Sequence, residues 1–420
     1  MREMKEGVVE YIESFPSTWK LKRLKYILRE RNERSSTGNE ELLSVSQYKG
    51  VIPSSENTMK TMSANSLVGY KKVFKGDLVF NKLNPGLARF GYSKYDGITS
   101  PDFAVYVANN KDVCRFLSYL LKTDRYVAYI KSKSTGVGDG FARLYTPQLF
   151  EFIVAMPNEH ELYCILDEID KKCGEIDEIS GLIEKQIETL EQYKRSIITE
   201  TVTKGLNKSV ELVDSGIKWI GKIPLGWEKL KIKDGFIRKK AKALQEDPVV
   251  LSLARSGVKI RDISTNEGQL AASYYEYNPV SIDDMLLNPM DLQSGANCSI
   301  SKVEGVISPA YINLRYKKGF NPRFYDYYFK IQYWSFAFFS YGKGVSFDNR
   351  WTLNEDTLMR LPLIVPPLEE QNAIADFLDK KCGEIDEIIA DKKAQLENLS
   401  LYKKSLIYEY VTGKKEVAYE

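Results

Sequence analysis

Hydrophobic residues recur at intervals of seven in two long stretches of this chain. In the first stretch the main series is Leu162, Ile169, Ile176, Ile183, Leu190 and Ile197, with Ile165, Leu166, Cys173, Ile179 and Ile187 as a second series beside it. In the second stretch Leu378, Ile385, Leu399 and Leu406 keep the same interval, and Lys392 interrupts it. A seven-residue apolar period is typical of helices that pack together as a coiled coil. The pattern predicts long helices at 158–206 and 367–420.

The remaining sequence has the pattern of compact modules rather than long helices. Short apolar runs such as DLVFN (77–81) and FAVYV (103–107) have the composition of strands, and Gly, Asn and Pro separate them. We therefore expect globular modules at 1–157 and 207–366. The predicted fold class is α+β, with two mixed α/β modules separated by two helices that form an antiparallel coiled coil.

The chain repeats itself. The decamer DKKCGEIDEI occupies 170–179 and again 379–388 without a difference, and YIESFPSTW (11–19) resembles WIGKIPLGW (219–227). Weaker matches join KGDLVFN (75–81) to IDDMLLN (282–288). The sequence thus predicts two copies of one unit, a module followed by a helix. In the decamer we expect Cys173 and Cys382 to pack, and Glu175, Asp177 and Glu178 to form a solvated or partner-facing edge.

Two glycines interrupt the predicted helices at equivalent places. Gly174 and Gly383 each cost about 1 kcal/mol relative to alanine inside a helix. Either a kink or a close helix contact would account for them, and the sequence leaves both open.

Charge separates along the same boundaries. The net charge is +8 for 1–157, −6 for 158–206, +5 for 207–366 and −4 for 367–420, within a total of +3. Basic modules suit DNA, because Lys and Arg neutralise phosphates while Arg, Asn and Gln read base edges. Acidic helices repel the same polyanion, so protein partners are the expected ligands of the helices.

The sequence lacks the residues that several classes of protein require. One histidine, His160, and five cysteines without a CxxC pair argue against Ser/His or Cys/His catalysis and the common zinc sites. No apolar run reaches the roughly 20 residues of a membrane span, and the first residues do not resemble a signal peptide. We expect a cytoplasmic protein without a metal site.

The helix openings and closings carry a family resemblance. MPNEHELYCILDEIDKK (156–172), VPPLEEQNAIADFLDKK (365–381), IPLGW (223–227) and VTKGL (202–206) make the chain resemble the specificity subunit of type I restriction-modification enzymes. The resemblance implies a non-catalytic subunit with two target-recognition domains, each reading one half of a bipartite DNA site. It also implies docking of two modification (methyltransferase) subunits and of restriction (translocase/nuclease) subunits. S-adenosylmethionine, ATP and Mg²⁺ would belong to those partners.

The expected length of the helices connects the resemblance to a mechanism. A helix of about 44 residues rises about 65 Å, which exceeds the roughly 34 Å of one DNA turn. Two such helices packed antiparallel predict two short specific sequences that flank an unread spacer.

Polar loops of the modules supply the candidate DNA-contacting residues. In the first module they are Asn81, Lys82, Asn84, Arg89, Tyr92 and Lys94, followed by Lys131, Lys133, Thr135 and Arg143 around STGVGDGFAR (134–143). In the second module they are Arg255, Lys259, Arg261, Asn288, Gln293, Asn297, Lys343, Asn349 and Arg350. The glycine-rich stretch lacks GKS or GKT and follows no clear strand, which argues against a nucleotide-binding loop.

Two other classes of function stay open at this point, an enzyme that acts on DNA by itself and a scaffold without nucleic acid. A stand-alone DNA methyltransferase would need an Asn/Asp-Pro-Pro-aromatic motif, and LNPMD (287–291) and FNPRF (320–324) lack the second proline. A metal-dependent nuclease would need a Glu-x-Lys after Pro101-Asp102, and none follows at a suitable distance. A coiled-coil scaffold without nucleic acid would explain the helices and leave the basic modules unexplained.

Overall fold

A computed structural model describes residues 2–47, 49–57, 66–136, 142–264, 271, 273–293, 295–344 and 351–417. The chain packs as two compact units, of which unit 1 contains 1–183 with 393–420 and unit 2 contains 184–392. The long helices are α4 (Glu159–Lys204) and α9 (Leu368–Val411). Each unit therefore holds one module together with part of both helices.

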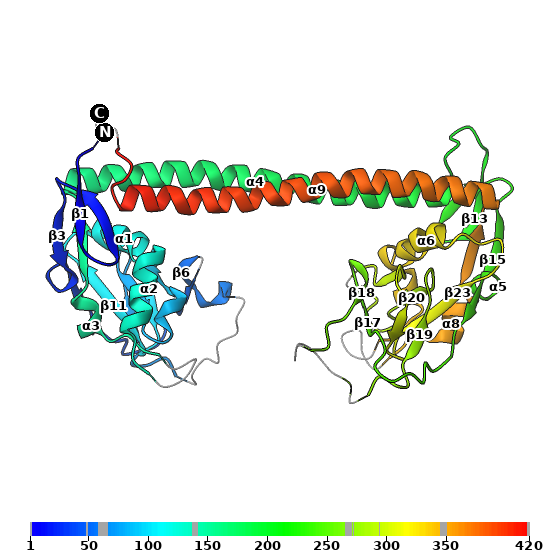
Figure 1. The fold of residues 1–420 in the computed structure, drawn as a ribbon, viewed down its shortest axis with the longest axis horizontal. Helices are drawn as coiled ribbons and strands as arrows, with labels where there is room; N and C mark the ends of the chain where they lie inside the picture. The colour runs from blue at the N-terminus through cyan, green and yellow to red at the C-terminus, as the bar shows by residue number, and fades with distance from the viewer. Residues whose placement is uncertain are drawn as a thin grey trace. The chain divides into compact units, whose positions relative to one another are not determined.

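The two helices run antiparallel within each unit (Figure 1). In unit 1, Lys403 Nζ donates to both carboxylate oxygens of Asp177 at 2.6 and 2.7 Å. In unit 2, Lys194 Nζ lies 2.6 and 2.5 Å from the oxygens of Asp386. These pairs connect equivalent positions of the repeat, because Asp177 and Asp386 belong to the two decamers and Lys194 and Lys403 follow them at the same interval. The predicted antiparallel coiled coil is confirmed within each unit.

Most of the seven-residue series is buried. Leu162, Ile169, Ile176, Ile183, Leu378, Ile385 and Leu406 are buried, and Leu190, Ile197 and Leu399 are half-buried. Ile179, expected in the second series, is instead 47% exposed, so that prediction was wrong. Seven residues after Cys173 comes Ser180, which is half-buried. Ile179 therefore lies one residue, or about 100° of helix rotation, away from the seam.

Beside the long helices, the described part of unit 1 has short antiparallel strands, three short α-helices and three 3-10 turns at Leu24–Tyr26, Ser54–Glu56 and Pro85–Leu87. Its paired strands are β1 (Met4–Val9) with β2 (Ile12–Pro16), β3 (Lys20–Arg23) with β12 (Ile153–Met156), β5 (Leu43–Ser46) with β6 (Gly50–Pro53), and β7 (Lys71–Val73) with β10 (Gly97–Thr99). A four-stranded sheet has the order β4 (Leu28–Glu30), β11 (Phe103–Ala108), β8 (Leu78–Asn81) and β9 (Phe90–Tyr92). The helices are α1 (Lys111–Leu120), α2 (Asp124–Lys133) and α3 (Thr146–Phe150).

Unit 2 repeats these pairings one by one. Its paired strands are β13 (Leu212–Ile217) with β14 (Gly221–Pro224), β15 (Glu228–Lys231) with β24 (Pro362–Val365), β17 (Leu251–Ala254) with β18 (Gly257–Ile260), and β19 (Asn278–Val280) with β22 (Gly305–Ile307). The four-stranded sheet has the order β16 (Phe236–Arg238), β23 (Ile312–Tyr316), β20 (Met285–Leu287) and β21 (Cys298–Ile300). The helices are α5 (Ile232–Gly235), α6 (Pro322–Trp334), α7 (Ala337–Ser340) and α8 (Glu355–Arg360).

Each hairpin tryptophan joins its module to the start of a long helix. Trp19 Nε1 donates to Glu161 Oε1 at 2.8 Å, and Trp227 Nε1 donates to Glu370 Oε2 at 2.9 Å. The helix ends pack on the same rings, since a Cβ on Gly413 would lie 3.1 Å from Trp19 and one on Gly205 would lie 3.3 Å from Trp227. Both glycines have φ near +70°, a backbone conformation that glycine adopts without strain.

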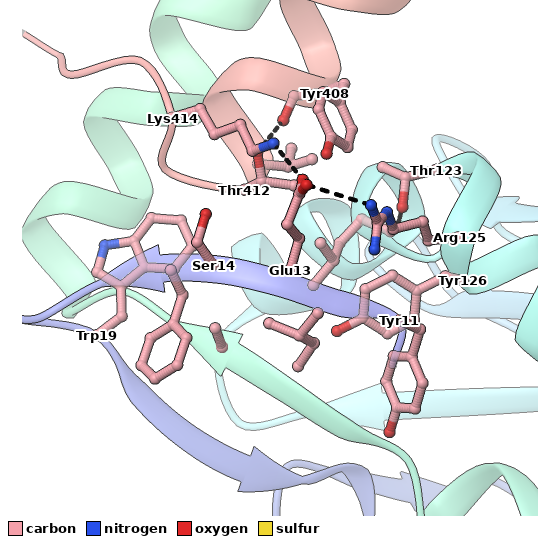
Figure 2. A pocket seen from close by; sticks show the side chains of 15 residues that line it. Tyr11, Glu13, Ser14, Trp19, Thr123, Arg125, Tyr126, Tyr408, Thr412 and Lys414 are labelled. Carbon is pink, nitrogen blue, oxygen red and sulfur yellow. Dashed lines mark hydrogen bonds and ion pairs between the residues drawn. The ribbon is translucent and has the colours of Figure 1, made fainter. Parts of the chain in front are cut away.

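An ion-paired carboxylate holds the end of α9 in unit 1. Glu13 accepts a hydrogen bond from Lys414 at 2.7 Å and pairs with Arg125 at 3.3 Å (Figure 2). The apolar cavity beside them measures about 20 Å³, room for about one water molecule. Gly221 and Leu206 stand at the equivalent positions of Glu13 and Lys414 in unit 2, so this contact belongs to unit 1 alone.

The helix α6 organises the interior of unit 2. It lies between α9 and the strands β20 and β23 (Figure 1), and nine of its thirteen residues are buried. Its N-cap, Asn321, accepts hydrogen bonds from the backbone of the first turn, as Asn110 does at the start of α1 in unit 1. None of the helices in the described ranges is long and apolar enough to cross a membrane.

Candidate nucleic-acid interface

The strands β8 and β20 position the polar loops of the two units. A buried carboxylate directly precedes each strand. Asp77 accepts a hydrogen bond from Arg31 Nε at 3.0 Å, and Asp284 accepts one from Lys239 Nζ at 2.7 Å. Asn81 ends β8 and Asn288 directly follows β20, and both asparagines make the same turn. Asn81 Oδ1 accepts from Leu83 N at 2.9 Å, and Asn288 Oδ1 accepts from Met290 N at 3.0 Å.

In unit 1, two polar segments that are distant in the sequence lie side by side. Asn84 N donates to Ala142 O at 2.7 Å, and Leu144 N donates to Lys82 O at 3.1 Å. Arg143 also forms a β-bridge with Thr135. The predicted residues Lys82, Asn84, Thr135 and Arg143 therefore belong to one surface.

Basic side chains gather on this surface. The methylene groups of Lys131 pack against Gly86. A Cβ added to that glycine would lie 3.3 Å from the nearest side-chain carbon of Lys131. Burial and then the charges of neighbours such as Lys71 and Arg143 lower the pKa of Lys82. A cationic group that is held near other cations suits a polyanion, because a phosphate would relieve the repulsion.

The turn of this loop adopts an unusual backbone. Asn84 has φ of 49° and Ala88 has φ of 50°, a left-handed conformation that costs a residue with a Cβ about 1–2 kcal/mol. Such strain concentrates at binding sites and switches.

Not all of the other residues predicted for the first module lie at this loop. Arg89 remains beside the loop, because Asn81 N donates to its carbonyl at 3.0 Å. Lys133 lies in the last turn of α2, where its Nζ is 5.2 Å from the Tyr129 ring. Tyr92 pairs with Leu78, at the opposite end of β8 from Asn81, and Lys94 follows it. The structure does not bring Tyr92 and Lys94 together with the loop.

Unit 2 assembles its polar loops in the same way. Asn288 N donates to Asn297 O at 2.9 Å, and Leu353 N donates to Pro289 O at 2.9 Å. Lys343 bridges Thr352, which brings it to the same region. Gln293 is exposed within the loop, whereas Asn349 and Arg350 lie outside the described residues.

The basic hairpin of unit 2 lies beside this loop. Arg255 occupies the exposed turn between β17 and β18, Lys259 is exposed on β18, and Arg261 follows, where its backbone N donates to Val250 O at 2.8 Å. A Cβ on Gly257 would lie 3.5 Å from Ser299 Oγ in β21. Because β21 begins directly after Asn297, hairpin and loop form adjoining surfaces.

Two residues with a role at these surfaces escape sequence reasoning. Tyr333 in α6 donates from its hydroxyl toward Asn288 O at 2.8 Å and Asn297 O at 3.2 Å. Lys122, two residues after the end of α1, donates from Nζ to Gln47 O in the β5–β6 turn at 3.2 Å. The common feature that could have revealed them is their place twelve residues after the N-cap asparagines, Asn110 and Asn321.

Lys122 predicts a measurable pH dependence. Burial lowers its pKa to about 8, well below the unfolded value, so the folded state loses this proton first as pH rises. Wild-type stability should therefore rise between about pH 8 and 10.5 by about 1–3 kcal/mol from this group. Lys122→Met lacks the titration. The difference in unfolding free energy between wild type and variant should shift with pH in favour of wild type, and a constant difference would contradict the assignment.

The decamer carboxylates have partners that the sequence did not indicate. Asp170 pairs with Arg115 of α1, and Asp379 accepts from Arg323 Nη1 and from the Tyr327 hydroxyl, both at 2.8 Å. Asp177, expected at a solvated or partner-facing edge, is exposed and also pairs with Lys403. The first and eighth residues of each decamer thus tie the long helix to its module and to the other helix.

Exposed decamer residues recur at equivalent positions of the two long helices. Gly174 and Gly383 are exposed, and an added Cβ on either would have nothing within 4 Å among the described residues. A close contact within the described chain therefore does not explain them. Ile179 and Ile388 are 47% and 45% exposed at equivalent positions.

The thiols and carboxylates do not form a reactive centre in the described ranges. Burial raises the pKa of Cys114 to about 12 and also raises that of Cys298, so both thiols stay protonated at neutral pH. No group of three His, Cys, Asp or Glu side chains suited to a metal ion occurs in this part of the chain. The chemistry of both surfaces is hydrogen bonding and charge.

Comparison with known proteins shows what the chain is similar to. Residues 224–398 match the model of the type I restriction modification DNA specificity domain. The chain is 24% identical over 430 residues to a putative type I restriction enzyme MjaX specificity subunit of Methanocaldococcus jannaschii, covering 96% of this chain and 95% of that protein. Residues 224–398 therefore carry a type I restriction modification DNA specificity domain, and the chain is similar to a specificity subunit over nearly its whole length.

One solved structure shares the fold of this chain, with a TM-score above 0.5. A chain from a study of complex assembly and conformational transition of the type I R-M system superposes with a TM-score of 0.66 at 14% identity, over 96% of this chain and 99% of that one. The HsdS subunit from Thermoanaerobacter tengcongensis matches over 98% of this chain and 100% of its own, with a TM-score of 0.48 and 14% identity. Specificity subunits are non-catalytic, and recognition of a DNA sequence is their function.

Proposed function

We propose that this specificity subunit reads a bipartite DNA site, one half with each module, and leaves the spacer between the halves unread. The observation that carries the proposal is the duplicated loop assembly, in which Asn81 and Asn288 make the same turn at the same strand end. The residues that follow differ, with Lys82 and Arg89 in one loop and Gln293 and Asn297 in the other. An identical scaffold with different polar groups suits two different short sequences.

Charge supports DNA over the other ligands. The modules carry net charges of +8 and +5, and the helix segments carry −6 and −4. A scaffold that binds no nucleic acid would have no need of basic loops with a strained backbone beside them. Phosphate contacts from Lys and Arg would supply affinity, and the amides of Asn and Gln would supply base discrimination.

We further propose that two modification subunits dock on the exposed decamer faces, one on each copy. Identical sequence at 170–179 and 379–388 is expected if the same partner surface binds twice. Ile179 and Ile388, exposed at equivalent positions, would supply apolar contact to the partner. Restriction subunits would join this assembly in the cytoplasm. S-adenosylmethionine, ATP and Mg²⁺ would bind to the modification and restriction subunits.

Selection from random duplexes tests the proposal. The specificity subunit, alone and with its modification subunits, is incubated with a random DNA library, and bound duplexes are sequenced. We expect a split motif with an unread gap, enriched most strongly in the complex, and methyl transfer only when modification subunits are present. A continuous motif would contradict bipartite reading. Methyl transfer by the subunit alone would instead favour a stand-alone methyltransferase, and absence of any DNA binding would favour a scaffold.

A further inference from the structure

The last turn of α6 lies against the 288–297 loop of unit 2, called the reading loop below. The Tyr333 side chain is buried, with 2% exposure, and its hydroxyl approaches the carbonyl oxygens of Asn288 at 2.8 Å and Asn297 at 3.2 Å. Those two residues are the ends of the loop, which their own backbone hydrogen bond closes at 2.9 Å. One hydroxyl therefore contacts both ends of a loop that carries three predicted DNA-contacting residues.

The other tyrosines of α6 serve different parts of the unit. Tyr325 and Tyr328 donate to Ile364 O at 3.2 Å and to Pro362 O at 2.9 Å, both in β24. Tyr327 donates to Asp379 of α9 at 2.8 Å. Of the four, Tyr333 is the one that bonds to the reading loop. The tyrosine hydroxyl groups of α6 thereby connect this helix to β24, to α9 and to the loop.

We propose that Tyr333 is a positioning residue for sequence reading: its hydroxyl fixes the ends of the 288–297 loop so that the loop side chains meet the base edges in one orientation. The inference rests on the proposed DNA-reading function and assigns to Tyr333 no contact with DNA. Its physical basis is that hydrogen bonds to base edges depend on the position of donors and acceptors. A loop whose ends shift presents the same groups with less discrimination.

Unit 1 uses the same helix position for a different segment. Lys122 and Tyr333 both lie twelve residues after their N-cap asparagines. Lys122 Nζ donates to Gln47 O, in the β5–β6 turn, and not to the 82–89 loop. The end of the module helix thus supports a different part of the reading surface in each unit, which is consistent with half-sites that differ.

The test compares Tyr333→Phe with the matched control Tyr328→Phe. Both changes remove one buried hydroxyl that donates to a backbone carbonyl, and both keep the ring. Each variant, in complex with the modification subunits, is taken through the same selection from random duplexes, and melting temperatures are measured in parallel.

We expect Tyr333→Phe to lose about three- to tenfold of its base preference in the half-site read by unit 2 and to retain the other half-site. Tyr328→Phe should retain both half-sites with a similar shift in melting temperature. An unchanged motif for Tyr333→Phe, or an equal loss with both variants, would overturn the inference while a split wild-type motif leaves the proposed function intact. A wild-type complex that selects no split motif would contradict the proposed function itself.

Discussion

Replacing both exposed isoleucines of the helix repeat, Ile179 and Ile388, by arginine should abolish binding of the modification subunits and with it methyl transfer. Each side chain is nearly half exposed in this chain, so substitution leaves the core of the unit intact. Arginine is a good helix former, and the helices should keep their stability. At a docked interface, a buried charge would cost about 2 kcal/mol or more per site, roughly 30-fold in affinity.

The single variants distinguish two docking sites from one. If each decamer face binds its own subunit, Ile179→Arg and Ile388→Arg should each form a complex with one modification subunit instead of two. Mass measurement of the assembled complexes reads this stoichiometry directly. A single variant that loses both subunits would show that the two sites are not independent.

The matched control is Leu401→Arg. Leu401 is 60% exposed on the same helix pair, but its equivalent in the first copy is Gln192, so it belongs to no repeated surface. We expect this variant to bind two subunits with wild-type affinity. Equal loss of binding in Leu401→Arg and in the isoleucine variants would contradict the assignment to the decamer faces and indicate a general effect of added positive charge on acidic helices.

The long helices were predictable because their signal is local and repeated. The seven-residue interval of residues such as Ile169 and Ile176 predicts which helix positions are buried, and these residues are buried in the structure. The prediction failed at Ile179, an apolar residue one position before the interval. The interval position itself holds a polar residue, Ser180, which composition alone does not assign to the seam. Composition alone does not separate an apolar residue of the seam from one on the outer face.

The candidate DNA surfaces were predictable only as separate pieces. Polar residues near Lys82 and near Arg143 could be recognised in the sequence, but their adjacency depends on hydrogen bonds between 82–84 and 142–144, which no periodicity encodes. Tyr333 was hidden for another reason. Four tyrosines stand in α6, and which hydroxyl meets the loop follows from the path of strands far away in the sequence.

The ionic contacts of the decamers explain why identity is concentrated there. Asp170 pairs with α1 and Asp379 pairs with α6, and Asp177 and Asp386 pair with a lysine of the opposite helix. Exposed ion pairs of this kind contribute about 0–1 kcal/mol each, so their value lies in register more than in stability. Within each unit, the helix register and the module position are set by the same ten residues.

The other large effect is expected from exchanging a whole module. A hybrid in which 207–366 is replaced by the corresponding segment of a relative with a different specificity should change one half-site and keep the other. Sequence discrimination by DNA-binding proteins spans about 10³- to 10⁷-fold, so the original second half-site should lose most of its enrichment. The reciprocal hybrid, with 1–157 replaced, should change the first half-site only. Selection from random duplexes with modification subunits present reads both outcomes.

The boundaries of the exchange decide whether the hybrid is informative. Trp227 must still meet Glu370, and the helix α6 must still meet Asp379, because these contacts attach the module to the long helix within unit 2. A relative that keeps a tryptophan and a hydrogen-bond donor at those two places preserves the attachment. If a hybrid with both contacts retained loses both half-sites, the modules do not read independently. Loss confined to the second half-site would show that specificity resides in the loops each module presents, and that the helix pair carries none of it.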